Sequence, residues 1–273
     1  MTKKELREYA ASIGLNMLGV APISRFESVP QHKHPASILP EARSVIVVGS
    51  SVPRGDYRGI EDGTLWQRSS RFIEAIYMYK FARFLEDEGG IAVPSTPLAK
   101  ERWPEGIKFR DGKVEPNVYP DLEYAVIACG LGEIGYCGLV ITPQFGIRQS
   151  LGLIITDLEI ETDEVFTGHI CHRENCSKCI EGCPMDAIDA SKPVQHEVCG
   201  VKYTTASVNR LKCRYCPNGT FPDTTHPDAM PNRLAAACSR ACMVHLEESG
   251  LVQNNLKTPF CRRKAWGFNL DEL

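Results

Sequence analysis

The cysteines of this chain are distributed unevenly, and this constrains its fold more than any other feature. Ten of the 12 cysteines of the 273-residue chain follow residue 170. In a reducing compartment, a local excess of thiols indicates metal ligation rather than disulfides. A disulfide-stapled secreted domain would need a signal peptide, and the segment Met1–Arg7 has no apolar stretch of that kind. We therefore expect a cytoplasmic protein whose C-terminal part binds metal.

Composition and charge narrow the possible partners. Hydrophobic residues make up 43% of the chain and charged residues 24%, which is typical of a globular protein. No apolar run approaches the length of a membrane span, so we expect no membrane partner. The net charge of −3 gives no electrostatic reason to expect a nucleic-acid partner.

The strongest motif lies in the segment Cys176–Pro184, whose spacing C-x2-C-x3-C-P ends the cysteine run of bacterial ferredoxins. In two-cluster ferredoxins, the cysteine before the proline binds the other cluster. Arg173 stands where the first cysteine of the run is expected, and Cys171 is the nearest substitute. The motif predicts 4Fe–4S ligation by Cys171, Cys176, Cys179 and Cys183.

A second, less regular set of cysteines predicts the partner cluster: Cys199, Cys213, Cys216, Cys238 and Cys242. The last two are four residues apart on a helix predicted over Asn232–Ser249, so both thiols face the same side. A structural zinc site is the alternative, because Cys213, Cys216, Cys238 and Cys242 make a plausible four-thiolate set. The first motif implies a second cluster and favours iron–sulfur ligation. Cys261 is a weaker candidate ligand.

The chain divides by character near residue 162. Residues 1–162 predict a mixed α/β domain for cofactor or substrate, and residues 163–273 predict a ferredoxin-like iron–sulfur domain that depends on metal for much of its core. A capping box at Thr2 and Glu5 predicts a helix that ends at Gly14. The remaining patterns predict a helix over Gln67–Glu88 and strands at Met17–Ala21, Ser44–Gly49, Ile91–Val93, Val140–Thr142 and Leu151–Thr156, and leave Leu122–Ala128 as either helix or strand.

The segment Gly130–Gly135 is a literal G-x-G-x-x-G, the fingerprint of dinucleotide-binding loops. Such a loop must open a helix whose N-terminus faces the pyrophosphate. Here Gly138, a β-branched pair and Pro143 follow, which argues against a helix. We therefore do not predict dinucleotide binding by this segment.

A family resemblance accounts for the motif better. The stretch Ala128–Gly146, with its continuation Leu151–Asp157, resembles the central signature of epoxyqueuosine reductases and reductive dehalogenases. The opening Tyr9–Pro22 also resembles the start of that family, as does the order of a glycine-rich core followed by two cysteine motifs. The resemblance spans about residues 5 to 245.

This resemblance implies an α+β fold, in which a nitroreductase- or cobalamin-processing-like α/β domain precedes a ferredoxin-like two-cluster domain. It implies a reductase that passes electrons from two 4Fe–4S clusters to a corrinoid or similar site, with an electron donor such as ferredoxin or flavodoxin and a small or nucleoside-like substrate. The implied proton donors are Asp121, Glu123 or Tyr124. The implied cofactor contacts are Gly130, Gly132, Gly135, Leu139, Ile141 and Thr142.

Several features keep other interpretations open. The carboxylates are slightly out of register with the family's acid, and Asp121 after Pro120 also fits a helix N-cap. Cys129 and Cys137 could be buried as small hydrophobes or could touch the cofactor. The family's usual helical repeats are not found before Leu273. An electron-transfer protein that has lost the corrinoid is the alternative function, and a zinc-stabilised binding module is a third.

Overall fold

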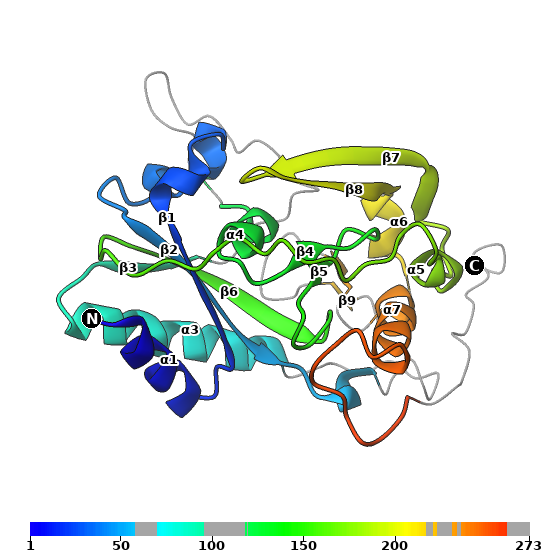
Figure 1. Cartoon of the computed structure of the whole chain (residues 1–273), viewed down its shortest axis with the longest axis horizontal. Helices are drawn as coiled ribbons and strands as arrows, with labels where there is room; N and C mark the ends of the chain where they lie inside the picture. Colours follow the sequence, from blue (N-terminus) through cyan, green and yellow to red (C-terminus); the bar gives the residue numbers. More distant parts are fainter. Residues whose placement is uncertain are drawn as a thin grey trace.

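The computed structural model describes residues 1–57, 70–95, 118, 120–216, 221–222, 231–233 and 236–260 (Figure 1). The chain begins with helix α1 (Lys3–Ser12), and the predicted capping box is present: the side chains of Thr2 and Glu5 bond each other's backbone N–H. Gly14 follows the helix at φ +90°, a conformation that glycine adopts without strain. The predicted start and end of this helix are therefore confirmed.

Four antiparallel strands form the central sheet, in the order β1 (Met17–Pro22), β2 (Ser44–Ser51), β6 (Gln149–Thr156) and β3 (Ala92–Ser95). All four were predicted. Two of these strands begin at other residues than predicted: β6 begins two residues before Leu151, and β3 begins at Ala92 instead of Ile91. The register places Ile46 of β2 opposite Ile154 of β6, at the middle of the sheet.

Helices cover both faces of this sheet, which explains why β2 is apolar at consecutive positions. Ile46 and Val48 pack with α1 and with α3 (Ser70–Asp87) on one face. Val45 and Val47 pack with α4 (Leu122–Ala128) on the other. Figure 1 shows α1 and α3 together on one side of the sheet and α4 on the opposite side.

The predicted long helix is confirmed over its described part, because α3 runs from Ser70 to Asp87 and residues 67–69 lie outside the described residues. The segment Leu122–Ala128, which the pattern left open, is a helix. After it, β4 (Glu133–Ile134) pairs with β5 (Val140–Ile141). The glycine motif thus contains β4 and opens no helix, as its sequence predicted, and β5 matches the strand predicted at Val140–Thr142.

The chain beyond Asp163 is built from short elements around a long hairpin. The hairpin strands are β7 (Ile188–Val198) and β8 (Val201–Val208), and the sequence did not predict them. The other elements are α5 (Lys178–Glu181), α6 (Arg210–Arg214), the strand pair β9 (Phe221–Pro222) and β10 (Pro231–Asn232), and α7 (Ala237–Glu248). Short 3₁₀ turns lie earlier in the chain, at Ile23–Phe26, Gln31–Lys33, Pro35–Ser37 and Arg54–Tyr57.

The helix predicted over Asn232–Ser249 was wrong at its start. Pro231 and Asn232 pair with Pro222 and Phe221 as β10, so α7 begins only at Ala237. Both cysteines of the predicted helix, Cys238 and Cys242, still lie on α7. Among the described residues, no helix is long and apolar enough to cross a membrane.

The glycine-rich segment and α7 share a core. Ile141 and Ile147 pack with Met243 and Leu246 of α7 and with Ile170. Gly146, at φ +62°, lies against the Met243 side chain. Side chains from both sides of residue 162 therefore build one core, and a boundary between two domains at this position stays a prediction.

Candidate metal centre

One pocket gathers cysteines from both predicted sets. The pocket is lined by Cys183, which follows α5, by Cys213 of α6, by Cys216 just after α6, and by Cys238 of α7. All four side chains are buried, and Arg233, Pro184 and apolar residues complete the lining. We call these four residues the second thiol group. Four buried thiols from three separate places in the chain are a donor set suited to an iron–sulfur cluster.

A neighbouring group of thiols includes the other predicted ligands. Cys179 of α5 packs in one buried cluster with Cys137, and each thiol shifts the pKa of the other. Cys242 of α7 interacts electrostatically with Cys137, Cys171 and Cys176. We call these residues the first thiol group: Cys137, Cys171, Cys176, Cys179 and Cys242. The two cysteines of α7 therefore divide between the groups, although they lie one turn apart.

Close packing of α5 against α7 brings the two motifs together. Gly182 ends α5, and a Cβ atom at this position would lie 2.6 Å from the Cβ of Ala241. Only a glycine permits this approach. The closeness of the two helices explains why a thiol of α5 and a thiol of α7 can share one group.

The thiols affect one another's protonation. The neighbouring Cys179 thiol lowers the pKa of Cys137 to about 6, against the effect of burial. The Cys137 thiol in turn raises the pKa of Cys179. Burial raises the pKa of Cys171 to about 11 and also raises the pKa of Cys242 and Cys213. Most of these thiols must therefore lose a proton when they ligate a metal.

A buried cation lies between the two thiol groups. Arg233 is 3% exposed; its Nη1 donates to the carbonyl oxygen of Cys137 at 3.0 Å, and its Nη2 lies 3.6 Å from Sγ of Cys238. Burial alone would lower the pKa of this guanidinium, but the nearby thiol groups raise it above its ordinary value. Arg233 therefore stays charged and faces both groups. The sequence analysis missed it, because no motif marks it.

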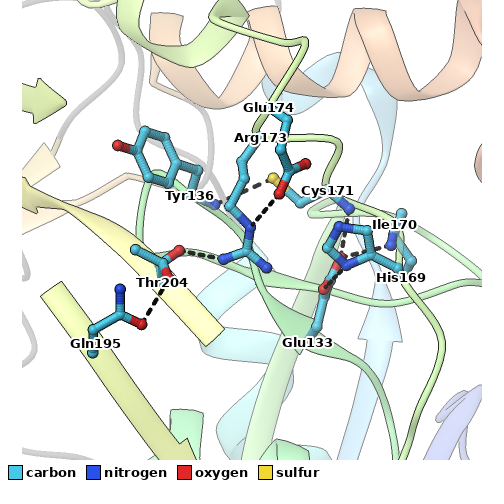
Figure 2. Close-up of polar contacts among 9 residues, drawn as sticks. All are labelled: Glu133, Tyr136, His169, Ile170, Cys171, Arg173, Glu174, Gln195 and Thr204. Carbon is cyan, nitrogen blue, oxygen red and sulfur yellow. Dashed lines mark hydrogen bonds and ion pairs between the residues drawn. The ribbon is translucent and has the colours of Figure 1, made fainter. Parts of the chain in front are cut away.

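The glycine motif positions Cys171 through a carboxylate (Figure 2). Oε1 of Glu133 accepts hydrogen bonds from the backbone N–H of Ile170 at 2.7 Å and of Cys171 at 2.5 Å, and Oε2 lies 3.2 Å from Nδ1 of His169. The backbone N–H of Tyr136 donates to Sγ of Cys171 at 3.3 Å. The sequence analysis also missed Glu133, which occupies a variable position of the G-x-G-x-x-G pattern.

Arg173, which replaces the usual first cysteine of the run, has a structural role. Its Nη1 donates to the carbonyl oxygen of Thr204 in β8, and its Nε lies 3.8 Å from Glu174 (Figure 2). The side chain ties the loop before α5 to the hairpin. The predicted substitute, Cys171, lies in the first thiol group.

The alternative zinc set is not assembled as predicted. Cys213, Cys216 and Cys238 share their pocket with Cys183 in place of Cys242. Within the described ranges, no group of three or more His, Cys, Asp or Glu residues is arranged to hold a single metal ion. Cys261 lies outside the described residues.

Cys199 lies apart from both thiol groups. It occupies the turn between β7 and β8 at φ +51°, and its Sγ lies 3.6 Å from the carbonyl oxygen of Arg25 and 4.0 Å from Oη of Tyr124. Its neighbours in the core include Tyr124 and Ile127. Metal ligation by Cys199 stays a prediction, and its position does not add to either group.

The predicted proton donors have structural partners. Oδ1 of Asp121 accepts from the backbone N–H of Glu123 at 3.0 Å and of Tyr124 at 3.3 Å, so the N-cap interpretation is confirmed. The Tyr124 hydroxyl donates to the carbonyl oxygen of Arg25 at 2.8 Å, and burial raises its pKa. Glu123 lies in the first turn of α4. A catalytic role for these three residues stays a prediction.

The predicted cofactor contacts mainly pack against the chain itself. A Cβ atom at Gly130 would overlap the carbonyl oxygen of Glu164, and one at Gly132 would overlap that of Ile141. At Gly135 it would overlap the Ile141 side chain, and Ile141 is itself fully buried. The remaining two, Leu139 and Thr142, pack beside this turn, and Thr142 donates to Gln149 at 2.5 Å. A corrinoid contact by these six residues stays a prediction.

A separate cavity of about 440 Å³ lies beside the glycine motif. Leu131 of that motif and Thr142, which follows β5, line it, and Arg7, Asn16 and Gln144 are among its polar lining residues. This volume is in the range of small-molecule sites, which are about 300–1,000 Å³. The cavity is therefore large enough for a small polar molecule.

The chain is similar in sequence to two kinds of reductase, although no protein-family model matches it. A tetrachloroethene reductive dehalogenase of Dehalobacter restrictus is 37% identical over 81 residues, which are 28% of this chain and 14% of the dehalogenase. An epoxyqueuosine reductase of Bacillus cereus is 23% identical over 218 residues, 68% of this chain and 52% of the relative. That of Prochlorococcus marinus is 23% identical over 270 residues, 89% of this chain and 80% of the relative.

Solved structures of the same two kinds share the fold. A reductive dehalogenase, described as suggesting a mechanism for B12-dependent dehalogenation, has a TM-score of 0.57 at 16% identity and covers 90% of this chain and 34% of its own. An epoxyqueuosine reductase with an epoxyqueuosine-modified tRNA-Tyr stem loop has a TM-score of 0.53 at 17% identity, over 88% and 64%. This chain is related in sequence and fold to epoxyqueuosine reductases and reductive dehalogenases, the resemblance that its sequence predicted.

Proposed function

We propose that this chain is an iron–sulfur reductase that carries two 4Fe–4S clusters, one in each thiol group. One observation carries the proposal: Cys183, which precedes Pro184 in the first motif, lies with Cys213, Cys216 and Cys238 of the second set. Cys242 of the second set lies instead with the first motif. This exchange of cysteines matches two-cluster ferredoxins, in which the cysteine before proline binds the other cluster. The named relatives support the reductase part.

The residues of the chain prepare both sites for electron transfer. When bound, such clusters supply one-electron transfer at potentials that nearby charge and burial tune. Six of the nine thiols in the two groups are buried, and Glu133 and Gly182 position their loops. Arg233 provides a positive charge next to both groups, which offsets the negative charge of thiolates. Thiol ligands need reducing surroundings, which supports a cytoplasmic location.

The identity of the electron acceptor is a separate part of the proposal. A corrinoid is suggested by the dehalogenase structure that is described as B12-dependent. Because the three glycines among the predicted corrinoid contacts lie against the chain's own atoms, we derive no reaction step through that group. The cavity of about 440 Å³ supports a small or nucleoside-like substrate, and a ferredoxin or flavodoxin would supply electrons. One relative was solved with a tRNA stem loop, so an RNA substrate belongs among the compounds to test.

The alternative function is an electron-transfer protein without a corrinoid. It is favoured because two of the predicted proton donors are hydrogen-bonded to the backbone. Asp121 caps α4, and the Tyr124 hydroxyl is bonded to the backbone. An electron-transfer protein would retain both clusters and exchange electrons with a protein partner. It would not reduce a small molecule. In both functions residues 163–273 supply most of the ligands, as a ferredoxin-like part, and residues 1–162 supply the acceptor side.

Anaerobic reconstitution with iron and sulfide tests the shared part. Two clusters require about eight iron atoms and eight sulfides per chain. Zinc without iron would refute the proposal in favour of a zinc-stabilised module. A titration with cob(II)alamin, followed by electron paramagnetic resonance (EPR), then separates the two functions: a changed cobalt spectrum supports the corrinoid reductase. An unchanged cobalt spectrum with intact clusters supports the electron-transfer protein.

A further inference from the structure

Cys137 lies in the turn that joins β4 to β5, within the glycine-rich segment. The turn is closed by two backbone hydrogen bonds, from Gly138 to Gly135 and from Gly135 to Leu139, both of 2.8 Å. Gly138 has φ +73°, which a side chain would make costly. This tight turn leaves the Cys137 side chain 1% exposed among the cysteines of α5 and α7. The residue belongs to neither cysteine motif.

The contacts of Cys137 are those of a member of the first thiol group. Its side chain packs in one buried cluster with Cys179, against which Cys242 also packs, and it is electrostatically coupled to Cys242 and Cys171. Its carbonyl oxygen is held by the buried Arg233 at 3.0 Å. The first thiol group therefore contains one thiol more than the four that a 4Fe–4S cluster binds.

Because Arg173 replaces the usual first cysteine of the run, one iron of the cluster needs another ligand. The structure offers two candidates for it. Cys171 is only partly buried, and its sulfur accepts the backbone N–H of Tyr136. Cys137 is almost completely buried, and it packs in the same buried cluster as Cys179, a motif cysteine, whereas Cys171 packs against a different cluster. The ligands of one cluster surround it, so packing beside a motif cysteine favours Cys137.

We propose that Cys137 ligates the iron–sulfur cluster held by Cys176, Cys179 and Cys242, at the corner that position 173 fills in the ferredoxin run. The inference rests on the proposed function, since it assumes that the first thiol group holds a cluster. Cys137 loses its thiol proton when the Sγ–iron bond forms. The cluster then joins the glycine-rich segment covalently to α5 and α7. Electrons gain a bonded route into residues 1–162, where the acceptor is proposed.

Cys129 provides a matched control seven residues after the start of α4. It is 0% exposed, and its Sγ donates to the carbonyl oxygen of Val45 at 3.4 Å. It packs in the apolar core with Val45 and Val47, apart from both thiol groups. Both cysteines are buried and lie outside the motifs, but Cys137 alone faces the first thiol group.

The test compares Cys137→Ala with Cys129→Ala in the full chain, after anaerobic reconstitution with iron and sulfide. Wild type and Cys129→Ala are expected to bind about eight iron atoms with the same EPR spectrum after reduction. Cys137→Ala is expected either to bind about four, a twofold loss, or to show a changed spectrum when Cys171 takes its place. A Cys137→Ala protein that matches wild type in both measurements overturns the inference. Wild type without iron instead overturns the proposed function.

If Cys137→Ala does not fold, wild type decides the question by alkylation and mass spectrometry. Cys137 is expected to be protected from iodoacetamide in the iron-loaded protein and to react at least tenfold faster after iron is removed. Cys129 is expected to react equally slowly in both states, because its protection comes from the apolar core. Equal reactivity of Cys137 with and without iron overturns the inference.

Discussion

Replacing Arg233 with glutamine should lower the reduction potential of the clusters. Arg233 is 3% exposed and is the charged group that faces both thiol groups, through Cys137 and Cys238. Reduction adds a negative charge next to this cation, so the guanidinium stabilises the reduced form. Arg233→Gln keeps much of the volume and a hydrogen-bond donor for the Cys137 carbonyl, but it removes the charge.

The expected size follows from the distance. Two unit charges at the 3.6 Å that separates Nη2 of Arg233 from Sγ of Cys238 interact by about 5 kcal/mol at an effective dielectric constant of ~20. For one electron, 1.4 kcal/mol corresponds to about 59 mV, so this energy equals about 200 mV. The added electron spreads beyond the sulfur onto the iron atoms, and doubling the distance halves the effect. We therefore expect the potential to fall by about 100 mV.

An EPR-monitored redox titration of the reconstituted protein measures this shift. Arg233→Lys is the control, because lysine keeps the positive charge and should leave the potential much nearer to wild type. Iron content and circular dichroism must show that both variants are folded and loaded. A loaded Arg233→Gln protein whose potentials lie within about 20 mV of wild type would refute the electrostatic role of Arg233.

Three further perturbations test how the thiol groups are held. Glu133→Ala removes the acceptor of two backbone N–H groups. It should lower the free energy of unfolding by about 1–3 kcal/mol for each buried donor. A loss under about 0.5 kcal/mol in urea denaturation would contradict this. Gly132→Ala should cost roughly 1–3 kcal/mol, because its Cβ would overlap the Ile141 carbonyl. Gly55→Ala is its control, since nothing lies within 4 Å of that position, and equal losses would show that the close approach is unimportant. Anaerobic iron chelation should lower the Tm, because ligand binding to the thiols contributes to folding; an unchanged Tm in calorimetry would mean that the Cys-rich part folds without metal.

The sequence predicted the central sheet well because its signals are local. Ser44–Gly49 is a run of apolar, mostly β-branched residues, and burial on both faces explains why such a run does not alternate. The hairpin β7–β8 gave no such signal. Most residues from Asp189 to Glu197 are polar and exposed, and a register shift between Asp189 and Pro193 breaks any alternation. Pro231 misled the prediction of α7, since a proline is as compatible with the short strand β10 as with a helix start.

The residues of the candidate site were likewise predicted only where the signal is local in the sequence. Motif spacing identified Cys179, Cys183, Cys213 and Cys238, because their relation is encoded within a few residues. Cys137 and Glu133 lie about 40 residues before the first motif, and only the folded chain brings them to it. Cys199 was included from the order of cysteines along the chain, without a local motif, and it lies beside Tyr124 instead.

These positions suggest a physical reason why the glycine-rich segment resembles that of its relatives. Its glycines admit close backbone contacts, with Glu164 at Gly130 and with Ile141 at Gly132. Those contacts place Glu133 against the Cys171 backbone and, in the proposal, place Cys137 at the cluster. A segment that holds thiols in position must keep its glycines whether or not a corrinoid is bound. The resemblance of this segment is therefore stronger support for the clusters than for the corrinoid, and substitutions at Gly130 or Gly132 should reduce iron binding before they affect any cobalt spectrum.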